Sequence, residues 1–428
     1  MTSQEDRLQK FHELRSTVRG SESMLVVGVD VAKDRHHAFF GTAAGKTLWK
    51  TLVFDNSMQG FQSLQAMTDN LVTQHGLQDR VYGVEPTASY HKPLAEYLIR
   101  TGEQVVYVSN VVVKNNRTSL DGRWDKNDTK DAANIADLIS RGRCQFYDLA
   151  EDDIRELRSL LAYRAKLKKQ EHAVRMRIRN NLLAQYFPEL DKQMPQGGQD
   201  ALILDIITQG FAPAQIAAMP FEAFRSRLKL QQRHIVQEGR LRSIWEASRD
   251  SVGCVMPEAA AWEGRMLVEQ LRQTRQIKQE LETQLKTIGQ RFPAYRCLLT
   301  IPGFGPIVSA MTIAALGDAQ RFTSRKQVLR LAGLDLSAYR SGTKSESAIP
   351  VISKQGKAGL RYALVQAATI ASYKDATLRT YFTRLLKGRE LERGIKLKMR
   401  VKLAAKLLVV ALTLMKRNEA FDPGYFRP

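Results

Sequence analysis

The first third of the chain alternates short apolar runs with amphipathic segments, and this pattern predicts an α/β domain. The apolar run at 24–31 predicts a buried strand, and the runs at 37–40 and 47–54 predict its antiparallel neighbours. Five elements are expected next, namely a helix at 57–74, a strand at 81–85, a helix at 88–100, a strand at 104–109 and a helix at 128–140. This element order is typical of the ribonuclease H-like fold.

The remainder of the chain predicts mostly helices. Two long amphipathic patterns, at 151–190 and 258–288, predict an antiparallel arm or a dimerising coiled coil. Pro and Gly residues at 194–198 interrupt the pattern and begin a weakly helical insert. Shorter helices are expected beyond the arm, at 308–316, 329–334, 360–373 and 384–406, the last of them basic and amphipathic.

We therefore expect an α/β domain that is joined through a helical linker to a mostly helical C-terminal domain. The linker contains the insert, whose role the pattern does not indicate. The expected boundaries are an N-terminal extension at 1–23, the α/β domain at 24–148, the linker at 149–293 with its insert at about 190–257, the C-terminal domain at 294–380, and a basic helix and tail at 381–428.

The charge balance indicates a polyanionic partner. The 428 residues include 65 Lys and Arg against 44 Asp and Glu, so the net charge is +21 and the pI is near 9.9. Nucleic acid is the first candidate, and the alternative is a basic protein that its charge keeps soluble. The stretch 163–169 leaves both open, because its basic residues suit a phosphate backbone or a solvated helix face equally well.

The sequence argues against several other classes of protein. No run approaches the roughly 18 uninterrupted apolar residues that a bilayer requires, so we expect no membrane partner. The start of the chain is polar and mixed in charge, which argues against a secretory signal. Cys144, Cys254 and Cys297 lie far apart, which argues against a zinc site or a disulfide scaffold and favours a reducing cytoplasm.

Four acidic residues provide the most specific chemical signal. Asp30 closes the first buried run, Glu85 closes the run at 81–84, and Asp128 and Asp131 project from one face at the start of an expected helix. Such clusters of hard carboxylate oxygens suit Mg²⁺ or Mn²⁺, and two ions can clamp both oxygens of a phosphodiester displacement. Singly, these acids would serve as caps or complement a helix dipole, but as an ordered set they favour metal binding.

A second group of candidates lies near the end of the chain. The segment Ile301–Pro306 resembles the turn of helix-hairpin-helix modules, where Gly303 and Gly305 would let backbone N–H groups approach phosphates. Ser341 by itself indicates only an ordinary loop. Positive charge for a phosphoryl transition state could come from Arg340, Lys344, Lys354 and Lys357.

These motifs together resemble one known family. Residues 27–33, 85–90 and 126–132 are similar to the three N-terminal motifs of the DEDD transposases of insertion sequences (the IS-one-ten group), to which Piv-type DNA invertases are related. Short motifs at 301–310, 321–322, 332–334, 341–342, 353–354 and 360–361 are similar to that family's transposase domain, so the resemblance covers roughly 24–145 and 295–375. Two departures occur, since Ala88 replaces a usual glycine and Asn127 a usual threonine. Neither departure removes a metal ligand.

The resemblance implies a fold and a mechanism. It implies a RuvC-like domain in which Asp30, Glu85, Asp128 and Asp131 hold Mg²⁺, with Mn²⁺ as an alternative. It also implies that Ser341 is a nucleophile that forms a transient phosphoserine link to DNA. Contacts to nucleic acid are expected from Lys126, Gly303, Gly305, Arg340, Lys344 and Lys354.

The partners follow from the same resemblance. The expected substrates are the double-stranded DNA of the element's ends and of the target, and the expected guide is a structured bridge RNA that the element encodes. Recombination holds two duplexes together, so a dimer or tetramer is expected, located in the bacterial cytoplasm at the nucleoid.

The predicted function is therefore that of a DNA transposase or recombinase, and three alternatives remain. The first is a metal-only RuvC-like nuclease of the Holliday-junction resolvase type, in which Ser341 is a loop residue. The second is a site-specific DNA invertase that needs no RNA. The third is a nucleic-acid-binding scaffold whose active site has decayed.

Overall fold

The computed structural model describes residues 4–120, 128–147, 149–195, 200–228, 234–337 and 351–426. The chain divides into two compact units. The first consists of Met1–Glu151 with Gln320–Thr323, and the second of Asp152–Ala319 with Ser324–Pro428. Within the described residues, no helix combines the length and the apolar character that crossing a bilayer demands.

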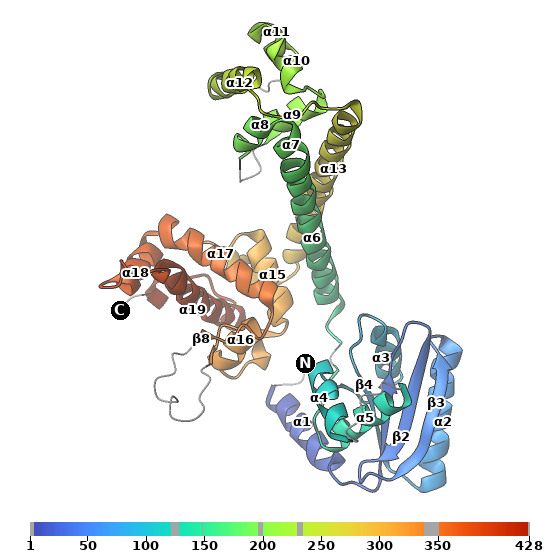
Figure 1. Cartoon of the computed structure of the whole chain (residues 1–428). Helices are drawn as coiled ribbons and strands as arrows, with labels where there is room; N and C mark the ends of the chain where they lie inside the picture. The colour runs from blue at the N-terminus through green and yellow to red at the C-terminus, as the bar shows by residue number, and fades with distance from the viewer. Residues whose placement is uncertain are drawn as a thin grey trace, which may run out of the picture. The chain divides into compact units, whose positions relative to one another are not determined.

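The first unit is built on a six-stranded sheet with the strand order β3-β2-β1-β4-β5-β6 (Figure 1). Strand β1 pairs antiparallel with β2 and parallel with β4, and β5 is parallel to β4. The strands are β1 (Met24–Asp30), β2 (Arg35–Thr42), β3 (Thr47–Asp55), β4 (Asp79–Val84), β5 (Val105–Tyr107) and β6 (Gln145–Phe146). The central pair therefore ends at Asp30 and Val84, which is where the predicted catalytic acids begin.

Helices cover both faces of this sheet. Alternate residues of β1 face opposite sides, so Leu25, Val27 and Val29 join one core while Val26 joins the other. The first core also contains α2 (Met58–His75) and α3 (His91–Arg100). The second contains α1 (Gln4–Val18), α4 (Asn110–Leu120) and α5 (Asp128–Ser140).

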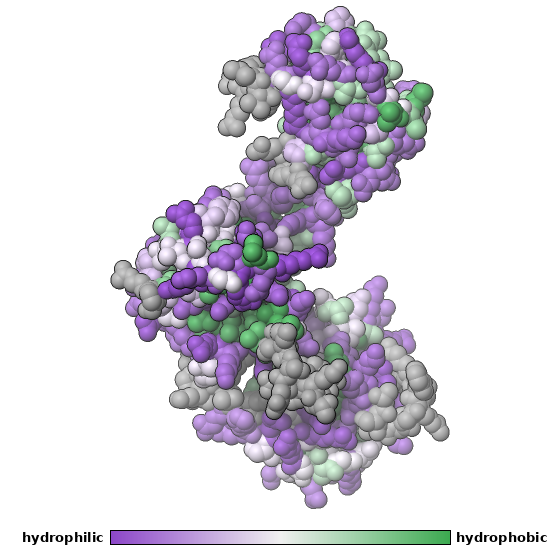
Figure 2. Space-filling view, turned by 60° about the vertical axis from the view of Figure 1, so that its left-hand side comes forward, coloured by the Kyte–Doolittle hydropathy of each residue, from purple (hydrophilic) through white to green (hydrophobic). Residues whose placement is uncertain are grey.

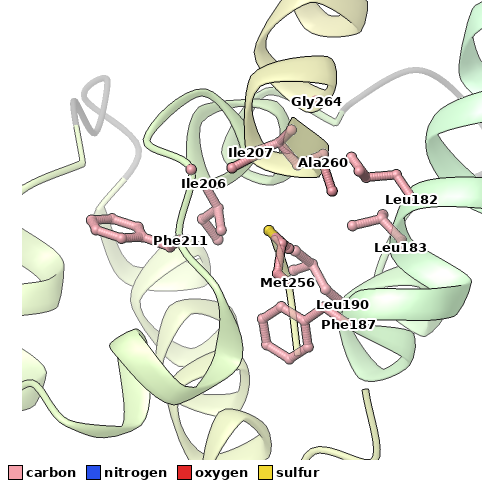
Figure 3. A pocket seen from close by; sticks show the side chains of 12 residues that line it. Leu182, Leu183, Phe187, Leu190, Ile206, Ile207, Phe211, Met256, Ala260 and Gly264 are labelled. Atoms are coloured by element: carbon pink, nitrogen blue, oxygen red, sulfur yellow. The ribbon is translucent and has the colours of Figure 1, made fainter. Parts of the chain in front are cut away.

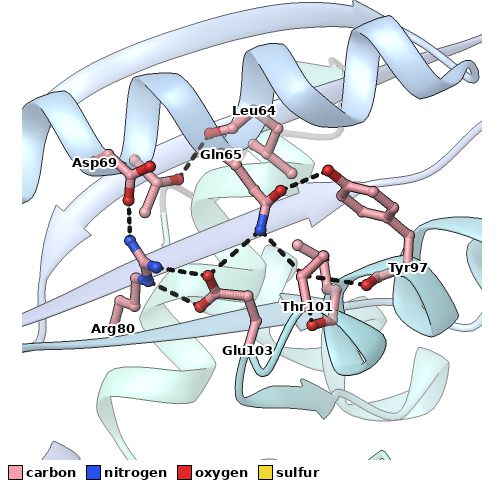
Figure 4. A network of polar contacts seen from close by, with 9 residues as sticks. Leu64, Gln65, Asp69, Arg80, Tyr97, Thr101 and Glu103 are labelled. Carbon is pink, nitrogen blue, oxygen red and sulfur yellow. Dashed lines mark hydrogen bonds and ion pairs between the residues drawn. The ribbon is translucent and has the colours of Figure 1, made fainter.

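A polar network joins α2, β4 and the end of α3 (Figure 4). The Arg80 guanidinium donates from Nε and Nη2 to the Glu103 carboxylate at 2.8 and 2.6 Å, and it also donates to Asp69. Tyr97 donates to Gln65 at 2.6 Å. These contacts lie at the amino end of β4, away from Glu85, so we assign them a structural role.

A pair of long helices runs side by side in the second unit (Figure 1). The first is α6 (Asp152–Arg177), which continues through a π-helical turn, η1 (Ile178–Leu183), into α7 (Ala184–Tyr186). The second is α13 (Glu258–Gly289). Arg164 pairs with Glu282 at 2.7 Å between the two helices, so this residue of the 163–169 stretch serves the helix pair.

The insert forms a small helical cluster at one end of this pair. Its helices are α8 (Pro188–Lys192), α9 (Ala201–Thr208), α10 (Pro213–Ala217), α11 (Phe221–Ser226) and α12 (His234–Arg249). Their apolar side chains form one core with the adjoining turns of the long helices. An enclosed space of about 20 Å³ remains between Phe187, Ile206 and Met256 (Figure 3), which is room for about one water molecule.

In the described residues of its C-terminal part, the second unit is helical except for one short hairpin. The hairpin pairs β7 (Leu336–Ser337) with β8 (Val351–Ile352). The helices are α14 (Pro293–Leu299), α15 (Pro306–Leu316), α16 (Arg325–Ala332), α17 (Ala358–Lys374), α18 (Ala376–Leu386), α19 (Ile395–Arg417) and η4 (Pro423–Phe426). The short η2 (Ala319–Arg321) begins at the last residue of this segment, and its other residues belong to the first unit.

The predicted mixed α/β N-terminal region and mostly helical C-terminal part are confirmed. One expected element is wrong, because no single helix spans 384–406. Instead α18 ends at Leu386 and α19 begins at Ile395, with Gly388 and Gly394 at φ of 78° and 76° between them. These left-handed conformations end one helix and begin the next.

Candidate active site and nucleic-acid-binding residues

Two of the predicted acids lie at the ends of adjacent parallel strands. Val29 of β1 is in register with Val84 of β4, so Asp30 and Glu85 follow at the same edge of the sheet. Both side chains are half-buried. Because the carboxyl ends of parallel strands open onto one edge, the sequence order alone brings these two acids together.

The third acid approaches this edge through a close contact between α5 and β1. A Cβ atom on Gly28 would lie 2.2 Å from the carbonyl oxygen of Ala132 and 2.7 Å from the nitrogen of Ala136. Only glycine therefore permits this packing. The contact holds the first turns of α5, which contain Asp131, beside the C-terminal half of β1.

Asp131 itself is buried, with only 2% of its surface exposed. It lies one turn before Ile135, whose side chain faces Gly83 of the sheet, so Asp131 also belongs to the sheet-facing side of α5. The guanidinium Nη2 of Arg117 lies 2.6 Å from its Oδ1. That oxygen nevertheless accepts no hydrogen bond of acceptable geometry from any described residue.

An incompletely satisfied buried carboxylate fits a divalent metal ligand, because such an oxygen is costly to bury without a partner. Asp128 begins α5, three residues before Asp131, and its side chain lies outside the described residues. Among side chains that are described, no group of three or more acids, histidines and cysteines surrounds a common point. The four-acid set therefore stays a prediction.

The loop after β4 contains a strained residue. Ala88 has φ of 46°, a left-handed conformation that L side chains rarely adopt, and this is the position where the resembling family usually has glycine. His91 follows at the start of α3, 7% exposed and 5.8 Å from the Tyr147 ring. Burial lowers the pKa of His91, which favours a neutral imidazole beside the Glu85 loop.

Four predicted site residues, Ser341, Arg340, Lys344 and Lys126, lie outside the described residues. The structure describes the two ends of the serine segment, which are paired as β7 and β8. Beyond β8, Lys357 donates its backbone N–H to Leu331 at 2.7 Å. Lys354 is exposed, with φ of 55°. The chain that leaves the serine segment is thus bound to the C-terminal end of α16.

The predicted phosphate-binding glycines differ from each other. Gly303, at φ of 87°, faces α17 closely, since a Cβ there would lie 2.3 Å from the carbonyl oxygen of Ala367. Its lack of a side chain is thus explained by packing. Gly305 has open space around it and is the residue before the first turn of α15. Gly305 therefore leaves space at the start of α15, where Pro306 lacks an N–H and the donors to an anion would come from the residues after it.

The positive charge of the chain is concentrated in residues 319–417, which include the basic helix expected at 384–406. Residues 319–417 contain 22 of the 65 basic residues but only 5 of the 44 acidic ones, which is +17 of the net +21. Lys396, Lys398 and Lys402 of α19 are exposed. Hydrophilic residues cover much of the surface seen in Figure 2. Residues 319–417 thus have the composition of a nucleic-acid-binding surface.

Comparison with known proteins relates both ends of the chain to transposases. Residues 27–188 match a family described as transposase, and residues 295–383 match the transposase IS116/IS110/IS902 family. A 43.6 kDa protein of insertion element IS110 from Streptomyces coelicolor is 23% identical over 84% of this chain and 86% of its own length. The pilin gene-inverting protein of Moraxella bovis is 22% identical over 94% and 98%. The transposase of element IS1328 from Yersinia enterocolitica is 25% identical over 81% and 84%.

These matches define an enzyme of DNA transposition and recombination. The chain belongs to the IS110-type transposases of insertion sequences, a group whose relatives include gene-inverting proteins. Transposases of this DEDD class typically use divalent metal ions. The recognition from sequence motifs is thereby confirmed.

Proposed function

We propose that the chain is an RNA-guided DNA transposase that uses both metal-bound carboxylates and a serine nucleophile. The observation that carries the proposal is the convergence of Asp30, Glu85 and the first turns of α5 in a chain that matches this family at both ends. The strand order, with antiparallel β1 and β2 followed by parallel β4 and β5, supports a RuvC-like domain.

Asp30, Glu85, Asp128 and Asp131 would hold the divalent ion, with Mg²⁺ first and Mn²⁺ as the alternative. Bound there, the ion would neutralise charge on the scissile phosphate. The protein's own contribution is to keep Asp131 desolvated and to hold α5 against β1 through Gly28. Carboxylates on a sheet edge and a packed helix are held more accurately than side chains on loops.

Ser341 would attack the scissile phosphodiester. Its Oγ forms a bond to phosphorus, the bond from phosphorus to one deoxyribose oxygen breaks, and that oxygen takes up a proton as a free hydroxyl. A second strand's hydroxyl then displaces Oγ, which recovers its proton. Because one phosphodiester bond is exchanged for another, the strands rejoin without an external energy source.

The excess positive charge of residues 319–417 supports binding of polyanions through their backbones. The proposed partners are double-stranded DNA of the element's ends and target, and a structured bridge RNA that supplies sequence choice by base pairing. Gly305, Lys126, Arg340, Lys344 and Lys354 are the proposed contacts. The α6–α13 pair would act as a coiled-coil arm in a dimer or tetramer.

Trapping of a covalent protein–DNA adduct tests the mechanism. Purified protein is mixed with Mg²⁺, the element's non-coding RNA and labelled DNA of the element ends, and denaturing gels reveal protein bound to label. Wild type should give an adduct, whereas Ser341→Ala and Asp30→Asn should give none while still shifting DNA on native gels. Strand cleavage and rejoining by Ser341→Ala would instead support a metal-only nuclease.

A second candidate is a site-specific invertase that works without RNA. It is favoured by the match to pilin gene-inverting proteins over nearly their whole length. Sequencing of RNA that co-purifies with the protein separates the two candidates. Enrichment of one structured transcript from the element supports the RNA-guided enzyme, whereas recombination that survives ribonuclease treatment supports the invertase.

A further inference from the structure

The contact between Arg117 and Asp131 is part of neither the family motifs nor the proposed chemistry. Arg117 lies on α4 and Asp131 on α5, and their side chains are 29% and 3% exposed. The 2.6 Å approach of Nη2 to Oδ1 makes an ion pair, but not one with good hydrogen-bond geometry. Arg117 Nε likewise has no hydrogen-bond partner among the described residues. A well-made structural ion pair would satisfy both groups.

The position of Arg117 is set by buried amides beside it. Asn116 donates from Nδ2 to Asn134 Oδ1 at 2.7 Å and to Asp137 Oδ2 at 2.8 Å. Asn134 in turn donates to the carbonyl oxygen of Val113 at 2.9 Å. Asn116 and Asn134 are 5% and 1% exposed. Since α4 and α5 are joined in this way one residue before Arg117, the guanidinium is held next to Asp131.

A guanidinium and a divalent cation cannot both occupy the same side of one carboxylate oxygen, because like charges at that separation repel strongly in a partly buried site. A buried carboxylate is costly without a counter-charge. A buried metal ligand therefore needs another positive group beside it when no metal is bound. An arginine whose hydrogen bonds are poor provides that charge and is readily displaced.

We propose that Arg117 is a positioning residue that neutralises Asp131 in the metal-free enzyme and leaves it when the divalent ion binds. Metal binding and release of Arg117 are then one coupled event, and Arg117 lowers the affinity of the site for metal. The inference rests on the proposed role of Asp131 as a metal ligand.

The test is Mn²⁺ binding to the full-length protein without nucleic acid, measured by calorimetry and by electron paramagnetic resonance of free Mn²⁺. Arg117→Met removes the charge and keeps the length of the side chain and a good helix former. We expect this variant to bind Mn²⁺ about tenfold more tightly than wild type. Arg117→Lys keeps the charge and should stay within about threefold of wild type.

Arg100→Met is the matched control, because Arg100 pairs with Glu96 of its own helix, α3, at 2.6 Å and neither residue belongs to the contact between α4 and α5. It removes the same charge and should leave Mn²⁺ affinity unchanged. Thermal unfolding in EDTA should show a loss of stability for Arg117→Met, and added Mn²⁺ should raise its unfolding temperature more than that of wild type. A purely structural Arg117 would not tighten metal binding.

Two outcomes overturn the inference in distinguishable ways. If Asp131→Asn abolishes Mn²⁺ binding while Arg117→Met binds as wild type does or more weakly, Arg117 does not compete with metal and the proposed function stands. If Asp131→Asn binds Mn²⁺ as wild type does, Asp131 is no ligand. The metal part of the proposed function then fails together with the inference.

Discussion

Asp30 and Glu85, together with Asp131 of α5, form what we call the acidic edge of the sheet, and Gly28 is the residue on which its geometry depends most directly. Its backbone lies against the backbone of α5, with room for no side-chain atom between them. Neighbouring Gly83 has a similar role, since a Cβ there would meet Ile139 at 2.0 Å. The obstacle at Gly83 is the end of a flexible side chain, which can move, whereas the obstacle at Gly28 is a helix backbone, which cannot.

Gly28→Ala is therefore expected to destabilise the protein by about 1–3 kcal/mol and to move the first turns of α5 away from Asp30. Urea unfolding gives the change in stability, and Mn²⁺ titration gives the loss of affinity at the acidic edge. The matched control is Gly239→Ala, since Gly239 lies in α12 with open space around it. That change should stabilise by about 0.5–1 kcal/mol. Equal behaviour of the two variants would contradict this account of the packing.

At the scale of residues, the sequence predicted the site residues whose positions depend on where a strand ends. It missed the residues whose roles depend on packing between distant segments. Asp30 and Glu85 each close an apolar run, so their shared edge follows from a parallel pairing. The role of Gly28 depends on which helix crosses β1, and that of Arg117 on where α4 meets α5. Neither contact leaves a periodic signal in the chain.

At the scale of elements, a buried ion cluster holds the long helices together. Asp200 is fully buried and accepts from Nη1 and Nη2 of Arg275 on α13 at 2.8 and 2.9 Å. Arg175 on α6 lies 3.5 Å from the same carboxylate. Glu171 of α6 accepts from Arg275 at 3.0 Å and from Lys278, and these bonds lower the pKa of Glu171 despite its partial burial. The cluster fixes how the two helices are aligned along their length.

Asp200→Asn should accordingly destabilise the second unit by about 3–5 kcal/mol, because it removes the fully buried counter-charge that Arg175 and Arg275 share, while Arg275 keeps its contact with Glu171. Asp205→Asn is the control, since Asp205 pairs with Arg272 at 2.6 Å near the surface and should cost less than about 1 kcal/mol. Chemical denaturation monitored by circular dichroism measures both changes. A small effect of Asp200→Asn would mean that the helices align through their apolar contacts alone.

Long elements were well predicted because their periodicity extends over many turns, as in α13 (Glu258–Gly289). The N-terminal helix α1 was not expected, since its residues are mostly polar, and among its described side chains Leu14 and Val18 reach the core. The break between α18 and α19 was missed because basic residues continue across it. The two helix ends are determined by Gly388 and Gly394, and these glycines do not interrupt the run of basic residues in the sequence.

For the molecule as a whole, the unequal distribution of charge is the dominant electrostatic feature. The residues outside 319–417 comprise 43 basic and 39 acidic side chains, a net charge of only +4. The overall net charge indicated nucleic acid as a partner but did not distinguish one region of the chain from another. Residues 319–417 are also where the predicted nucleophile Ser341 lies in the sequence.

Replacing Lys396 and Lys398 with glutamine should weaken binding to double-stranded DNA of any sequence and lower the slope of log affinity against log salt by about 2. Fluorescence anisotropy at several salt concentrations provides this slope. Replacing Lys46 and Lys50, which are exposed in the first unit, makes the same change in net charge and should leave the slope nearly unaltered. Equal slopes for the two double variants would show that net charge alone governs binding.

The π-helical turn Ile178–Leu183 has a consequence for how the insert is oriented. A regular α-helix advances about 100° per residue, and a π-turn accommodates an additional residue without breaking the helix. Because the wider turn takes up that residue, deleting one residue here would restore regular winding and leave everything beyond it at nearly the same angle around the helix axis. The chain can thus differ in length by one residue at this turn while the side chains that build the core of the insert keep the same faces toward α13.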